Sequence, residues 1–165
     1  MEDLLVQIEL ALKCNLYYLA LQSALTLPDI CSSLINVDGT TSGSQYISWF
    51  DDHAKEDGDC AISGSDCYKF RCSNLHQGSS INSRSSYSRI MFIEPVITNI
   101  SIHNCIMNDA LCIDLNRFCN NLISAVRTWL VLVKNDSNFK KNYPKLIKRY
   151  PDGIAPYIGG LPVIS

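Results

Sequence analysis

The positions of apolar residues along the chain predict mostly helices. From 3 to 25 the apolar residues recur three and four apart and also lie on the remaining sides, which predicts a helix at the centre of a bundle. Pro28 suits the first turn of a helix, so a second, short helix is expected to begin there and to end near Leu34. A third helix is expected over 44–54, with core residues at Tyr46, Trp49 and Phe50.

Capping residues predict the limits of two further helices. The segment 63–66, Ser-Gly-Ser-Asp, offers side-chain acceptors for free backbone N–H groups, so a helix is expected to begin there, run to about Gln77 and stop at Gly78. Residues 79–88 follow as a flexible, serine-rich loop. Asp114 caps the most regular helix of the chain, whose buried stripe consists of Leu115, Phe118, Cys119, Leu122, Val126, Trp129 and Val133.

Between these helices the hydrophobic period changes from helical to alternating. Residues 90–93 form a short apolar run, and from 96 to 103 apolar and polar residues alternate as they do in a strand. Asn and Asp at 108–109 suit a turn, after which 110–113 adds a third strand. The sequence therefore predicts a mainly α fold, a helical bundle with a small antiparallel β meander inserted at about 90–113.

Prolines and glycines mark the end of this bundle. Between 151 and 165 they recur too often for a regular helix or a central strand. The length of 165 residues suits a single domain. We therefore expect one domain over 1–150 and an irregular tail over 151–165.

Composition narrows the class of protein. With 47% hydrophobic and 18% charged residues the chain is not a disordered one, and its net charge of −2 does not suit a basic nucleic-acid coat protein. The N-terminus lacks the positive charge of a secretory signal, and the apolar stretch after it is interrupted by polar residues that a membrane span excludes. We expect a cytoplasmic protein without a membrane partner.

Cysteines and histidines are the reactive groups to place. The chain has 8 cysteines and none is spaced C-x-x-C, so we expect reduced, mostly buried thiols, no metal site and no cofactor. It has 3 histidines. His53 is expected at a solvated helix end and His103 on the polar surface of a strand. His76 stands apart, because Arg71 precedes it by five positions near the end of the capped helix.

The segment from Arg71 to His76 resembles the Arg-x4–6-His signature of the HEPN superfamily, the higher eukaryotes and prokaryotes nucleotide-binding domains. The resemblance implies a compact helical bundle. It also implies a metal-independent endoribonuclease, of a toxin–antitoxin or phage-defence system, in which Arg71 and His76 are catalytic. Cys72 departs from the polar residue that often follows the arginine in that family, and the β insert at 90–113 is not part of the small HEPN bundle.

The two residue types suit cleavage of RNA by its own 2′-hydroxyl. His76 supplies proton transfer, and Arg71 binds the phosphate oxygens on which negative charge builds up. Five residues of an ideal helix turn by about 140°, so the two side chains do not line up within one helix. Either Arg71 curls round or a second subunit completes the site, and the second option favours a homodimer.

Neighbouring polar residues are candidates for binding the substrate. Lys69 lies on the same helix face as His76, and Ser79, Ser80 and Arg84 belong to the loop that follows. Cys72 is a weaker candidate for a nucleophile, because no residue that would orient a Cys–His pair can be identified.

Two other classes of function remain open. One is a non-catalytic HEPN-like module that binds a nucleotide, RNA or a protein partner such as an antitoxin. The other is an interaction protein whose apolar helices form a homodimer face. The basic run over 134–149, with interleaved aromatic residues, is either a solvated helix face or one wall of an RNA groove.

Overall fold

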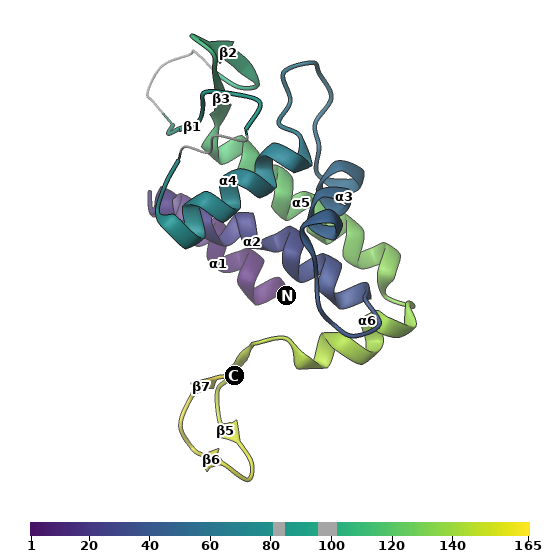
Figure 1. The fold of residues 1–165 in the computed structure, drawn as a ribbon. Coiled ribbons are helices and arrows are strands. Elements are labelled where there is room, and N and C mark those ends of the chain that lie inside the picture. Colours follow the sequence, from purple (N-terminus) through teal and green to yellow (C-terminus); the bar gives the residue numbers. More distant parts are fainter. Residues whose placement is uncertain (81–84, 96–101) are drawn as a thin grey trace.

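The computed structural model describes residues 1–80, 85–95 and 102–165 and shows a helical bundle with a small sheet at one end (Figure 1). The helices are α1 (Glu2–Lys13), α2 (Tyr17–Ile35), α3 (Gly43–His53), α4 (Gly64–Gln77), α5 (Leu115–Val133) and α6 (Ser137–Asn142). The predicted mainly α fold with a β insert is confirmed. Helix α2 packs against each of the other five, and is therefore the central helix of the bundle.

The prediction for the first two helices was wrong about where the chain breaks. The expected helix over 3–25 is divided at Asn15, whose φ of 58° lies in the left-handed region that asparagine tolerates better than most residues. Pro28 does not open a helix but lies inside α2. One long helix therefore carries both the apolar residues before the proline and Asp29 after it.

A contact with α3 lies next to the proline of α2. Pro28 has no N–H, so the carbonyl of Ala24, four residues before it, has no helical donor. The buried hydroxyl of Tyr46, on α3, donates to the carbonyl oxygen of Leu25 at 3.1 Å. Burial raises the pKa of Tyr46, which keeps this hydroxyl protonated as a donor.

Helices α3 and α4 begin and end at the residues whose chemistry suits those positions. Ser42 and Gln45 form a capping box at the start of α3, and Ser63 accepts from the Asp66 N–H at 3.1 Å at the start of α4. Gly78 ends α4 with a φ of 61°, as predicted. Gly64 lets the two helices approach closely, because a Cβ there would lie 2.6 Å from the carbonyl oxygen of Ile47 in α3.

The inserted sheet is mixed and not an antiparallel meander. Its strands are β1 (Arg89–Ile93), β2 (Cys105–Met107) and β3 (Ala110–Asp114), in the spatial order β1-β3-β2. Strands β2 and β3 form the expected hairpin, with positive φ at both Asn108 and Asp109 as a two-residue primed turn requires. Strand β1 runs parallel to β3. Most of the alternating segment 96–103 lies outside the described residues, and 102–103 are not in a strand.

Helix α5 continues directly from β3. Asp114 accepts from the Arg117 N–H at 2.8 Å and caps it as predicted. The predicted stripe from Leu115 to Trp129 is buried in the common core. Among the helices of the described part of the chain, none is long and apolar enough to cross a membrane.

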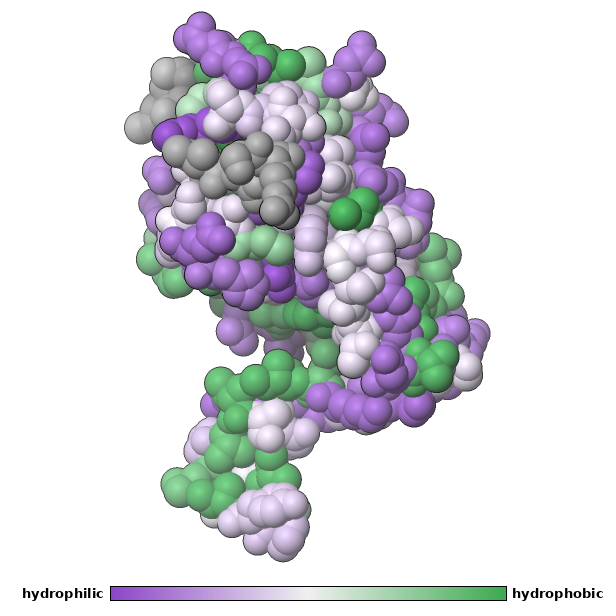
Figure 2. All heavy atoms as spheres, viewed as in Figure 1, coloured by the Kyte–Doolittle hydropathy of each residue, from purple (hydrophilic) through white to green (hydrophobic). Residues whose placement is uncertain are grey.

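The C-terminal segment forms an arm. After α6 come a 3-10 turn (Tyr143–Lys145) and the two-residue strands β4 (Arg149–Tyr150), β5 (Gly153–Ile154), β6 (Ile158–Gly159) and β7 (Val163–Ile164). Figure 1 shows this arm projecting from the bundle. The tail predicted as irregular thus contains short paired strands, β4 with β7 and β5 with β6. Figure 2 shows that much of the arm surface is apolar.

Candidate functional site

The structure brings Arg71 and His76 together within one chain. Nη1 of Arg71 lies 3.3 Å from Nε2 of His76, so the arginine curls round the helix to reach the histidine. His76 is exposed, whereas only 20% of the Arg71 side chain is. Of the two geometric options that the sequence left open, the structure shows the first.

An aspartate that sequence reasoning missed completes this cluster. Oδ2 of Asp29, on α2, lies 2.6 Å from Nη2 of Arg71. Asp29 is the only charged residue within the apolar stretch of α2. A carboxylate alone in an apolar helix was the available signal, because such a group is rarely buried without a partner.

Helices α2 and α4 meet in two polar contacts along this cluster. Gln22 of α2 donates to Asn74 of α4 at 3.3 Å, while Asp29 further along α2 pairs with Arg71 earlier along α4. Residues seven apart on α2 and three apart on α4 share a helix face, so both contacts lie on the same seam. These two contacts between α2 and α4 fix the position of Arg71 beside His76.

Burial and ion pairing shift the pKa values of Asp29 and Arg71 in opposite directions. Burial raises the pKa of Asp29, and the attraction of Arg71 offsets this only in part. For Arg71, burial works to lower the pKa, but the carboxylate of Asp29 prevails and raises it. The guanidinium therefore stays charged at the site.

The charge of Arg71 decides how His76 is bonded. A guanidinium donates hydrogen bonds and cannot accept them, so Nε2 of His76 must be the acceptor. In that tautomer the ring proton is on Nδ1. Nε2 carries the lone pair that a general base needs, but Arg71 occupies it in the free protein. A phosphate that draws Arg71 toward itself would release the lone pair.

Cys72 and Tyr68 line the same side of α4. The Cys72 thiol is half-buried, 4.0 Å from Nη1 of Arg71. Its hydrogen bond with the Tyr68 hydroxyl raises the pKa of Tyr68. Cys72 therefore lies in contact with the arginine rather than occupying a separate nucleophile site.

The predicted substrate-binding residues lie in different places. Lys69 pairs with Asp66, its Nζ 3.6 Å from Oδ1, one turn nearer the start of α4. The N–H of Ser79 donates to the carbonyl of Ser73 at 3.0 Å and closes the C-terminal cap of α4. Ser80 is exposed beside a shallow pocket. Arg84 lies outside the described residues.

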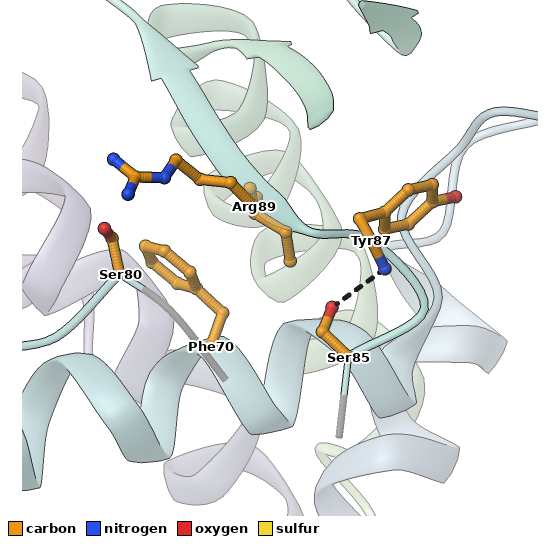
Figure 3. Close-up of a pocket in the computed structure, with 6 residues that line it drawn as sticks. Phe70, Ser80, Ser85, Tyr87 and Arg89 are labelled. Atoms are coloured by element: carbon orange, nitrogen blue, oxygen red, sulfur yellow. Dashed lines mark hydrogen bonds between the residues drawn. The ribbon is translucent and has the colours of Figure 1, made fainter. Parts of the chain in front are cut away.

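That pocket separates α4 from β1. Figure 3 shows the Phe70 ring between Ser80 and Ser85, with the guanidinium of Arg89 on the Ser80 side. The pocket has a volume of about 10 Å³, room for about one water molecule, and is lined by Phe70, Ser80, Ser85, Tyr87, Arg89 and Ile90. Arg89 and Tyr87 were not among the residues singled out from the sequence.

The other two histidines have different environments. His53 is exposed at the end of α3, where its ring packs 5.3 Å from that of Trp49. The surface position expected for His103 is wrong, because only 5% of its side chain is exposed. Its Nδ1 accepts from the Asp114 N–H at 3.1 Å, and its Nε2 bonds to Glu56. His103 therefore anchors the sheet to the bundle.

The cysteines are free thiols, and four of the eight are buried, fewer than expected: Cys31, Cys67, Cys112 and Cys119. Burial raises the pKa of Cys67 and of Cys119 to about 12, so these two thiols stay protonated. Within residues 1–80, 85–95 and 102–165, no group of three His, Cys, Asp or Glu side chains is placed to hold a metal ion.

Comparison with known proteins adds no relative. None of the family models, curated proteins or solved structures that were searched matches this chain.

Proposed function

We propose that this protein is a metal-independent endoribonuclease of the HEPN type, with Arg71 and His76 as its catalytic pair. The observation that supports this is the 3.3 Å approach of the arginine to an exposed histidine at the end of a capped helix. The motif thus corresponds to a real pair of side chains and not only to a spacing in the sequence.

The reaction uses groups that the pair already holds. Nε2 of His76 takes the proton of the RNA 2′-hydroxyl, whose oxygen attacks the adjacent phosphorus. Arg71 binds non-bridging phosphate oxygens, where charge increases toward the transition state. The 5′-oxygen leaves and takes up a proton, so the products are a 2′,3′-cyclic phosphate and a 5′-hydroxyl. We place this activity in the cytoplasm, in toxin–antitoxin or phage-defence systems.

Asp29 has a positioning role in this proposal. It anchors one edge of the guanidinium through Nη2, which leaves Nη1 to move between His76 and a phosphate. Nε of Arg71 is buried and has no acceptor among the described residues, so the guanidinium has unused hydrogen-bonding capacity. Binding of a phosphate would satisfy more of its donors than the free protein does.

A second candidate is a non-catalytic HEPN-like module that binds RNA or a protein partner. The observation that favours it is the coverage of Arg71, four-fifths of which is buried against Asp29 and its neighbours. If Arg71 cannot leave this position, His76 keeps a bonded lone pair and no base is available. The two candidates differ in whether His76 is needed for RNA cleavage.

We also propose a homodimer, although not for the reason that the sequence suggested, which was a poor alignment of Arg71 and His76 within one helix. One chain is enough to bring Arg71 to His76, so the pair does not require a second subunit. Support comes instead from the C-terminal arm, which exposes large apolar side chains at Ile147, Tyr157, Leu161 and Ile164. Exposed apolar groups gathered in this way mark association surfaces. Light scattering that finds only monomer would contradict this.

The test is cleavage of RNA in EDTA by the pure protein and by two matched variants. We expect cyclic-phosphate ends from the wild type, their loss in His76→Ala, and their retention in His53→Ala. His53 is a suitable control because it is also an exposed histidine at the last residues of a helix. Full activity in His76→Ala, or a need for a divalent ion, would overturn the proposal. RNA binding without cleavage would leave the second candidate.

A further inference from the structure

We propose that Cys105 and Cys112 form a redox-responsive thiol site, in which a small disulfide such as oxidised glutathione converts the two thiols into a bond between β2 and β3. Figure 1 shows the hairpin of these two strands at the end of the bundle opposite the C-terminal arm. Neither cysteine belongs to the catalytic pair, so the inference does not rest on the proposed function.

The register of the hairpin places the two cysteines directly opposite each other. Cys105 of β2 pairs with Cys112 of β3 in the antiparallel ladder. Opposite residues of such a ladder have their Cα atoms about 4.5 or 5.5 Å apart, depending on the kind of pair that they form. Both spacings lie within the roughly 4.4–6.8 Å over which a disulfide joins two Cα atoms. The strands therefore suit a disulfide without a shift of one strand along the other.

Both thiols lie on the same face of the sheet. Leu111 and Ile113, on either side of Cys112 in β3, belong to the common core. Side chains alternate along a strand, so Cys112 points to the other face, and its cross-strand partner Cys105 shares that face. Burial raises the pKa of the Cys112 thiol, and the Cys105 thiol and a hydrogen bond with it raise this pKa further. The two sulfur groups are therefore in contact.

The pairing of the strands fixes this arrangement. Asn108 and Asp109 form the two-residue turn of the hairpin, with φ of 48° and 62°. Strand β3 is also paired with β1, so one of the two cysteines lies on the central strand of the sheet. Two thiols held in contact have a high effective concentration, which favours an internal disulfide over a mixed disulfide with a small molecule.

The exposure of the two thiols sets the order of the steps. Cys105 is partly exposed and Cys112 is buried. The Cys105 thiolate attacks one sulfur of the small disulfide, forms a mixed disulfide and releases the other half as a thiolate. Cys112 loses its proton and attacks the Cys105 sulfur, which releases the second half. The protein loses two protons and two electrons, and the small disulfide becomes two thiols.

Two thiols are too few ligands for a zinc site. Structural zinc takes four ligands. Within residues 1–80, 85–95 and 102–165, no third His, Cys, Asp or Glu side chain joins Cys105 and Cys112 to form a metal-binding group. Their contact is instead the geometry of a dithiol, and a disulfide of this kind is transient in a reducing compartment.

The test equilibrates the folded protein with a fixed concentration of reduced glutathione and a rising concentration of oxidised glutathione. The remaining thiols are then alkylated in denaturant. Trypsin cuts after Arg89 and Arg117 and releases residues 90–117 as one peptide, whose cysteines are Cys105 and Cys112. Mass spectrometry of this peptide distinguishes two alkylated thiols, an internal disulfide and a glutathione adduct.

Cys14 is the control within the same protein, because it is an exposed cysteine at the end of α1. We expect half of the 90–117 peptide to hold the internal disulfide at an oxidised-glutathione concentration at least about tenfold below that at which half of Cys14 carries glutathione. Dithiothreitol should reverse the bond.

Two sets of variants separate the roles of the thiols. Cys112→Ser should retain glutathione on Cys105, which has lost its partner, and Cys105→Ser should leave Cys112 as a thiol. Cys112→Ala serves in place of the serine variant if that variant does not fold, and circular dichroism checks each fold.

An internal disulfide that forms in the folded wild type at low oxidised glutathione supports the site. A 90–117 peptide that stays alkylated in mixtures that modify Cys14 overturns it. So does an internal disulfide that forms as readily when urea unfolds the protein, because the fold would then contribute nothing to the contact.

Discussion

Arg71 reaches His76 across five positions of one helix and places its Nη1 3.3 Å from Nε2. The contact depends on a third residue from another helix, since Asp29 holds the opposite edge of the same guanidinium. A packing contact between α2 and α4 therefore positions the guanidinium of Arg71 beside the ring of His76.

Substitution by alanine should lower the stability of the fold to different extents at His76 and at Arg71. His76 is exposed, so His76→Ala is expected to change the free energy of unfolding by no more than about 0.5 kcal/mol. Arg71→Ala removes the partner of a largely covered carboxylate and should cost about 1–3 kcal/mol. Urea denaturation of both variants measures this difference. Equal costs would mean that the Asp29–Arg71 pair adds nothing to the fold.

Asp29 should affect cleavage without touching RNA. Asp29→Asn keeps the shape of the side chain but removes the charge that anchors Arg71, so kcat/KM should fall by up to about 10²-fold as the guanidinium loses its position. The binding of uncleavable RNA should change much less. Asp3→Asn is the control, because Asp3 is an exposed carboxylate on α1. An unchanged rate in Asp29→Asn would show that Arg71 is positioned by other contacts.

Glu56 should make the protein sensitive to acid. Burial works to raise the pKa of Glu56, but its bonds to His103, Arg117 and Asn104 prevail and hold it below the usual 4.5. A lowered pKa in the folded state contributes stability above about pH 4.5, and this contribution is lost as the pH falls through the folded value. Unfolding free energies of wild type and Glu56→Gln should differ most above that pH.

Below about pH 4.5 the unfolding free energies of the wild type and of Glu56→Gln should converge. Asp57→Asn is the matched control, because Asp57 is the exposed neighbour of Glu56 and its substitution should leave the pH profile as it is. A constant gap between wild type and Glu56→Gln at every pH would attribute the loss to packing instead of charge.

Gly64 should be required for the position of α4. A Cβ at this residue would lie 2.6 Å from a backbone oxygen of α3, which cannot turn away as a side chain would. Gly64→Ala is therefore expected to cost about 1–3 kcal/mol, the range for overpacked sites. Gly159→Ala should cost less than about 0.5 kcal/mol, because a Cβ there meets nothing within 4 Å. Thermal or urea unfolding measures both, and similar stabilities would contradict the close approach.

Local chemistry was predictable from the sequence because it acts between near neighbours. Ser63 and Gly78 limit α4, and Asp114 begins α5, since a cap needs only a side-chain oxygen or a permitted left-handed φ within a few residues. The turn at 108–109 follows for the same reason. The Arg71–His76 spacing was readable as well, and so was the apolar stripe that α5 buries.

Relations between distant segments were decided by the tertiary structure alone. Pro28 lies inside α2 and not at the first turn of a helix, and the nearby carbonyl of Leu25 accepts from Tyr46 of α3, a bond that no local preference contains. Strand β1 pairs in parallel with β3, and His103 is buried against Glu56, through contacts that alternation along one strand cannot specify. The sequence by itself determined that Arg71 and His76 lie five positions apart near the end of α4. Only the packing of α2 against α4 decided that Asp29 would hold Arg71 beside His76, because that contact depends on how two helices align in space.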